Sequence, residues 1–90
     1  MLQVMSKQLI RSSTSIGANV VEAQASSSRK DFSNFINHSL KSANETRYWL
    51  GLLRDTSTSK KEEINVLLKE AQELSKILGS AVKSLRKKKA

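Results

Sequence analysis

The hydrophobic residues of this chain recur every three or four positions along three segments, and two polar breaks separate these segments. The breaks read ASSSRK at 25–30 and DTSTSK at 55–60. Because apolar residues at a period of 3.6 mark one face of an amphipathic α-helix, each segment predicts a helix. The expected helices cover residues 2–24, 28–54 and 59–87, followed by a basic tail at 86–90.

These three helices predict an all-α fold in a single domain, residues 1–90, because a chain of 90 residues is no longer than one ordinary domain. The short breaks make consecutive helices antiparallel neighbours, as in a helical bundle. Ser28 is expected to cap the second helix, with Asp31 in its first turn. Ser59 and Glu62 have the spacing of a capping box for the third.

The first helix contains the small-residue stretch STSIGANVVEAQ, residues 13–24, in which Ser13, Gly17 and Ala18 predict a close approach by another helix. A glycine inside a helix costs about 1 kcal/mol, so a packing reason is expected for it. No second glycine or Lys-Ser/Thr pair follows at the spacing of a phosphate-binding loop.

Polar residues interrupt the apolar stripes of the first two helices. Buried amides and carboxylates need hydrogen-bonding partners, so we expect a structural polar network between these helices. Its expected members are Asn19, Glu22, Arg47 and Tyr48.

The net charge of +8 favours polyanionic partners, RNA or DNA, through release of counterions. The candidate nucleic-acid contacts are Arg11, Arg29, Lys30, Arg47, Arg54, Arg86, Lys87, Lys88 and Lys89. The alternative is that these cations only keep the surface hydrated, in which case the bundle binds proteins and no nucleic acid.

Several classes of function are not expected from these residues. The chain has no cysteine and one histidine, which excludes disulfides and argues against a metal site. No nucleophile motif or triad pattern is present, so we expect no enzyme, no cofactor and no small-molecule substrate. No apolar run reaches the roughly 18 residues that a membrane span needs, and no secretory signal is present, so we expect a cytoplasmic protein.

The short length also predicts self-association. A domain of this size buries a small share of its surface, and without disulfides or a metal the remaining source of stability is oligomerisation. The second helix carries an apolar face wider than a single packing seam requires, which favours several packing neighbours.

The sequence resembles a known family in several motifs: SIGAN followed by EAQ, then RKDF, then ANETRYWLGLL, all within Lys7–Thr56. The segment KILGSAVKSLRK is similar to the closing helix of the same family. This family comprises the four-helix-bundle proteins related to the large-subunit (23S) ribosomal RNA intervening-sequence protein.

The resemblance implies an antiparallel bundle without catalytic activity that assembles as a ring-like homopentamer. One relative, the accessory protein of diversity-generating retroelements, binds nucleic acid through a basic surface. Family members carry a further helix before the segment that begins at Lys7. The three helices expected here therefore correspond to helices two to four, and either the start is truncated or another subunit supplies the missing helix.

Overall fold

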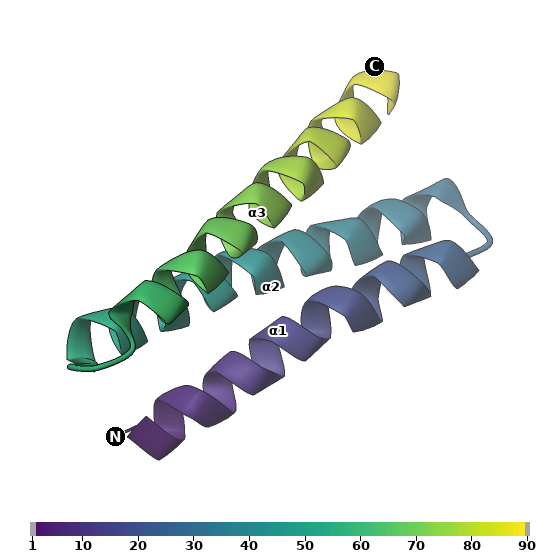
Figure 1. Ribbon diagram of the computed structural model, residues 1–90. Coiled ribbons are helices and arrows are strands. Elements are labelled where there is room, and N and C mark those ends of the chain that lie inside the picture. Colours follow the sequence, from purple (N-terminus) through teal and green to yellow (C-terminus); the bar gives the residue numbers. More distant parts are fainter. Residues whose placement is uncertain (1, 90) are drawn as a thin grey trace.

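Three long helices make up the computed structural model, which describes residues 2–89, and the side chains of residues 3–87. The helices are α1 (Leu2–Ala25), α2 (Arg29–Thr56) and α3 (Lys61–Lys89), in chain order (Figure 1). These bounds lie close to the ranges predicted from the hydrophobic pattern. The all-α fold class is confirmed.

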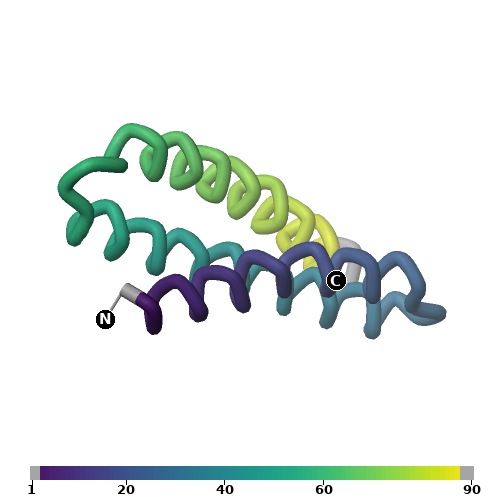
Figure 2. The backbone as a smooth tube through the Cα atoms, turned by 60° about the horizontal axis from the view of Figure 1, so that its bottom comes forward, coloured from purple at the N-terminus to yellow at the C-terminus, as the bar shows by residue number. Residues whose placement is uncertain are grey.

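The helices run antiparallel, and α2 is the central one (Figures 1 and 2). It packs against both flanking helices, whereas no Cα of α1 lies within 8 Å of a Cα of α3 among the described residues. The molecule is elongated, with extents of 48 × 20 × 15 Å. Because the backbones of α1 and α3 do not approach each other, one side of the bundle is left open.

A serine caps the start of α2, as we predicted, but not the start of α3. Ser28 caps α2, since its hydroxyl accepts from the Asp31 N–H at 3.1 Å, as expected. The capping box predicted at Ser59 is wrong. The Ser57 hydroxyl accepts from the Lys60 N–H at 3.2 Å, and the Lys60 carbonyl accepts the first helical bond, from Ile64. The Ser57 bond therefore closes the turn that precedes α3, which begins at Lys61.

The core consists of two clusters of buried apolar side chains. One contains Ile16 and Ala23 of α1 with Ile36 of α2 and Leu78 and Val82 of α3, around the fully buried Ala43. The other contains Leu50, Ile64 and Ala71, towards the opposite end of the bundle. All three helices thus contribute buried residues to the first cluster, where α1 and α3 meet only through side chains.

Buried hydroxyl groups hold α1 against α2. The Ser39 hydroxyl donates to the Ile16 carbonyl at 2.9 Å, and the Thr46 hydroxyl donates to Ser12 Oγ at the same distance. Ser12 and Ser39 are fully buried, and Ser42 reaches Ser15 at 3.0 Å at the edge of the contact. Small side chains let the two backbones approach, and each buried hydroxyl finds a partner there.

Candidate nucleic-acid interface and apolar groove

The polar network predicted from Asn19, Glu22, Arg47 and Tyr48 does not form. The Asn19 amide donates to the Ser15 carbonyl of its own helix at 2.8 Å, and Glu22 is exposed. Arg47 and Tyr48 face away from α1, since they line an open depression together with residues of α3. The periodic pattern placed these residues on the correct helices but could not show which side of α2 faces α1.

Instead, Arg47 belongs to a line of arginines where α2 meets α3. At one end the Arg29 guanidinium donates to the Leu85 carbonyl of α3 at 3.1 Å. At the other end Arg54 Nη1 lies 3.5 Å from Asn65 Oδ1 of α3, and Arg54 Nε also donates to Asp55 at 3.2 Å. Arg47 lies between them, beside the α3 side chains of Leu68 and Gln72. All three arginines therefore follow the same helix–helix boundary.

The facing side of α3 carries a row of exposed lysines. Lys69, Lys76 and Lys83 are spaced seven residues apart, which puts them on one stripe of the helix. Asn65 and Gln72 share this stripe by their spacing of three and four residues, and both lie at the boundary with α2. The lysine row thus borders the same boundary as the arginines.

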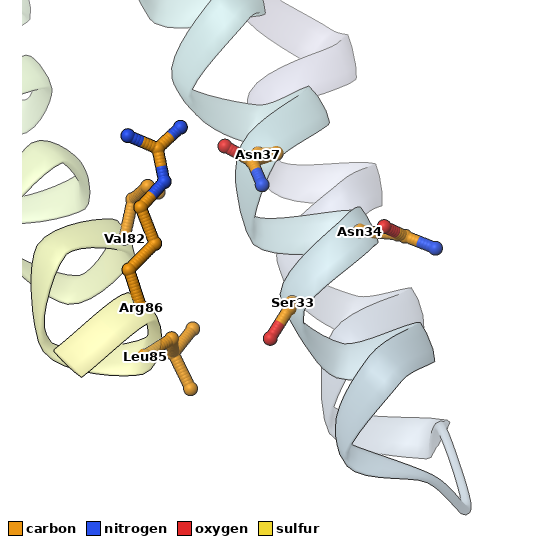
Figure 3. A pocket seen from close by; sticks show the side chains of 6 residues that line it. All are labelled: Ser33, Asn34, Asn37, Val82, Leu85 and Arg86. Atoms are coloured by element: carbon orange, nitrogen blue, oxygen red, sulfur yellow. The ribbon is translucent and has the colours of Figure 1, made fainter. Parts of the chain in front are cut away.

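Arg86 completes this surface at the end where α3 approaches the start of α2. Figure 3 shows Arg86 and Leu85 of α3 facing Ser33 and Asn37 of α2 across a small cavity. The Ser33 hydroxyl is buried and has no hydrogen-bonding partner among the described residues. We refer to the whole surface as the basic seam and define it by seven cations: Arg29, Arg47, Arg54, Lys69, Lys76, Lys83 and Arg86.

The basic seam includes some of the predicted nucleic-acid contacts and omits others. Arg29, Arg47, Arg54 and Arg86 lie on it, and Lys30 and Lys87 are exposed within about a turn of its end. Arg11 lies elsewhere, because it pairs with Glu45 on the α1–α2 side of the molecule. The side chains of Lys88 and Lys89 lie outside the described part of the chain. Lys69, Lys76 and Lys83 were missed, although their heptad spacing is visible in the sequence.

An apolar groove opens between α1 and α3, and it has a volume of about 520 Å³. Leu9 and Gly17 of α1 form one wall, Leu67 and Leu74 of α3 form the other, and Leu50 of α2 lies between them. Five large apolar residues outside its lining are exposed on the same two helices, among them Val4 at 57%. The other four are Ile10 at 63%, Val21 at 62%, Val66 at 59% and Ile77 at 65%.

The close approach predicted at Ser13, Gly17 and Ala18 is wrong within a single chain. A Cβ built on Gly17 would meet no atom within 4 Å, and Gly17 is exposed at the groove. Close packing occurs instead on another face of α1, at the buried Ser12, where the Thr46 hydroxyl of α2 donates a hydrogen bond to the Ser12 hydroxyl. Gly17 thus borders an open groove, not a packed neighbour.

We expect Gly17→Ala to raise the free energy of unfolding of the isolated chain by about 0.5–1 kcal/mol, because alanine favours the helix and meets no obstacle. Thermal or urea unfolding at low protein concentration measures this. Gly79→Ala is the matched control: it lies on α3, also has free space, and does not line the groove. A destabilised Gly17→Ala beside a stabilised Gly79→Ala would mean that something packs against Gly17.

Two further properties bear on function. Among residues 2–89, no cluster of three or more histidine, cysteine or carboxylate side chains is placed to hold a metal ion. None of the three helices combines the length and apolar character that crossing a membrane requires, as far as the described residues extend.

The fold and its charged surface define a class of protein: an all-α helical bundle with one strongly basic boundary and one apolar groove. Residues 2–80 match the model of the 23S rRNA-intervening sequence protein family. The chain belongs to this family, as the SIGAN, RKDF and ANETRYWLGLL motifs predicted.

A solved structure supports the same assignment. The chain is similar to a protein of unknown function from the S23 ribosomal protein family of Bacteroides thetaiotaomicron, with 49% identity and a TM-score of 0.83. The alignment covers 89% of this chain and 74% of that one. No curated protein matches the chain.

Proposed function

We propose that this chain is a non-enzymatic helical module that binds nucleic acid through the basic seam and self-associates through the apolar groove. The observation that carries the first part is the convergence of seven cations on one boundary between two helices. In α2 alone, the arginines at 29, 47 and 54 span 25 residues, or roughly 38 Å of helix. This length is close to the roughly 34 Å of one turn of a DNA duplex.

The chemistry of the seam suits a phosphate backbone. Arginine and lysine neutralise phosphates, and side-chain amides such as those of Asn37, Asn65 and Gln72 supply further hydrogen bonds. The family description names an rRNA intervening sequence, which agrees with an RNA partner. On this basis we also propose a cytoplasmic location, where ribosomal RNA lies.

The groove supports the second part of the proposal. It leaves apolar walls on α1 and α3 exposed to water, and exposed apolar patches of this kind mark sites of protein association. A homopentamer, expected from the resemblance, is the stoichiometry to test.

The test of nucleic-acid binding is an anisotropy titration of a labelled 20-nucleotide RNA between 50 and 300 mM salt. We expect log K to fall linearly with log salt by about 0.7 per neutralised phosphate, so that four contacts give a slope of about −3. No binding at 50 mM salt, or binding indifferent to salt, contradicts the proposal.

The groove alone favours a second candidate, a protein-interaction bundle that binds no nucleic acid. In that case the lysines and arginines only hydrate the surface. Deleting Arg86–Lys89 separates the two candidates: it weakens RNA binding under the first and leaves association with a protein partner unchanged under the second.

A further inference from the structure

Tyr48 is the aromatic side chain most exposed in the described part of α2, at 60% exposure. Its ring contacts the neighbouring Trp49 edge-on, with centroids 5.0 Å apart and an interplanar angle of 74°. Trp49 is half-buried, so it provides a fixed support for the tyrosine. One side of the Tyr48 ring thus contacts Trp49, while most of its surface stays open.

The surroundings of this ring are those of the basic seam. Tyr48 lines an open depression with Asn44, Arg47, Leu68 and Gln72. Arg47 Nη1 lies 3.4 Å from Asn44 Oδ1, which leaves its remaining donors free for other partners. An apolar leucine, two amides and a guanidinium thus surround one exposed aromatic ring.

This combination matches what an unpaired base requires. Its flat face stacks on an aromatic ring, its polar edge pairs with amides, and the adjoining phosphate pairs with arginine. A base inside a duplex is already stacked and presents no free face. An exposed tyrosine in a row of cations is therefore useful to a single strand and of little use to a duplex.

We propose that Tyr48 is a stacking platform for an unpaired base of single-stranded RNA or DNA, with Arg47 binding the neighbouring phosphate. This inference rests on the proposed nucleic-acid function and specifies its ligand. The strand runs along the basic seam, and its base at Tyr48 lies between the amides of Asn44 and Gln72. Stacking depends on the ring and not on the phenolic hydroxyl.

The experiment compares Tyr48→Ala and Tyr48→Phe with the parent chain, using labelled 20-nucleotide oligo(U), oligo(dT) and a 20-base-pair duplex. Tyr48→Ala should weaken single-strand binding by about fivefold or more, as loss of one stacked base does. Tyr48→Phe should bind within about twofold of the parent, because the ring remains. Neither change should alter duplex binding. Phe32→Ala, which removes the other ring exposed on α2, is the control and should have no effect.

A second readout uses the only tryptophan of the chain, Trp49. A base that stacks beside it should change its emission on titration with oligo(U), and this change should be lost in Tyr48→Ala. Helical circular dichroism confirms that each variant is folded.

The outcomes separate this inference from the proposed function. Salt-dependent binding that is unchanged in Tyr48→Ala overturns the stacking site and leaves the seam proposal standing. Equal losses for single strands and duplex in Tyr48→Ala also overturn it, since they indicate general damage to the seam. A parent chain that binds none of the probes overturns both proposals. If Tyr48→Ala weakens the binding of oligo(U) but not of oligo(dT), the result supports an RNA site that also uses the 2′-hydroxyl. If Tyr48→Ala weakens the binding of both single strands, the result supports a site that contacts only the base.

Discussion

Replacing Arg47 and Lys76 together by glutamine should lower the affinity for single-stranded RNA about 25-fold at 0.1 M salt. Both residues lie on the basic seam, one on α2 and one on α3. Each neutralised phosphate contributes about 0.7 to the magnitude of the slope of log K against log salt. If each residue neutralises one phosphate, the magnitude of this slope should therefore be smaller by about 1.4 in the double variant. The counterion contribution to binding disappears near 1 M salt, so the parent and the variant should bind alike there. Between 1 M and 0.1 M salt, a slope difference of about 1.4 corresponds to a difference in affinity of about 25-fold.

The matched control is Lys7→Gln with Arg11→Gln on α1. It removes the same two charges, also one lysine and one arginine, from a part of the molecule away from the seam. Arg11 is already paired with Glu45, which leaves it less available to a phosphate. We expect the control to keep most of the affinity and most of the slope. Equal losses in the two double variants would show that net charge, and not the seam, determines binding.

Neither double variant should unfold the chain. Arg47 makes only a long hydrogen bond to Asn44, and Lys76 is exposed. Exposed substitutions of this kind usually change the free energy of unfolding by less than about 0.5 kcal/mol. A loss of binding can then be assigned to lost phosphate contacts.

The positions of the helices and the local cap of α2 could be predicted from the sequence. The helix positions follow from the helical spacing of the apolar residues and from the polar breaks between the segments. Each turn of an amphipathic helix places an apolar residue on the buried face, so the spacing repeats along the whole helix. The Ser28 cap was predictable as well, because a cap is a local interaction between a side chain and an amide a few residues away.

The orientation of each helix about its own axis was not predictable in the same way. Leu67 belongs to the periodic apolar seam of the third helix, yet it is 50% exposed at the groove. Tyr48 and Arg47 of α2 were expected to contact α1, but they face α3. Periodicity identifies which residues share a face, and packing among all three helices decides which neighbour that face meets. The network predicted around Asn19 and Glu22 failed for this reason.

Charged residues lie on both sides of the buried stripe of α3, and Glu62 shares the stripe of the lysine row by its spacing of seven from Lys69. Lys69, Lys76 and Lys83 border the basic seam, whereas Glu70 lines the apolar groove, and Glu63 shares its face by a spacing of seven. The two proposed surfaces therefore use different sides of the same helix. A nucleic acid on the seam leaves the groove accessible, so an oligomer built through the groove would display several seams at once. Several linked seams would bind one long strand more tightly than a single copy does.

Introducing aspartate at Leu67 and Ile77 together should abolish self-association and leave the single chain folded. Leu67 lines the groove, and Ile77, at 65% exposure, lies on the same side of α3 by helical spacing. Both are exposed in the single chain, so a carboxylate there remains hydrated. In an assembled groove the same carboxylates would lose their water among apolar walls, which costs several kcal/mol per unpaired charge. The dissociation constant of the assembly should rise more than about 100-fold.

Light scattering coupled to size-exclusion chromatography measures this from the mass of the eluted species, against 10.0 kDa for one chain. Asn65→Asp with Gln72→Glu is the control, because it adds the same charge to the same helix on the seam side. This control should keep the parent's mass. A parent chain that elutes as a folded monomer at every concentration would refute self-association. An unchanged assembly in Leu67→Asp/Ile77→Asp would instead place the contact outside the groove. Because assembly stabilises only the folded chain, the parent's melting temperature should also rise with concentration, and that of the groove variant should not.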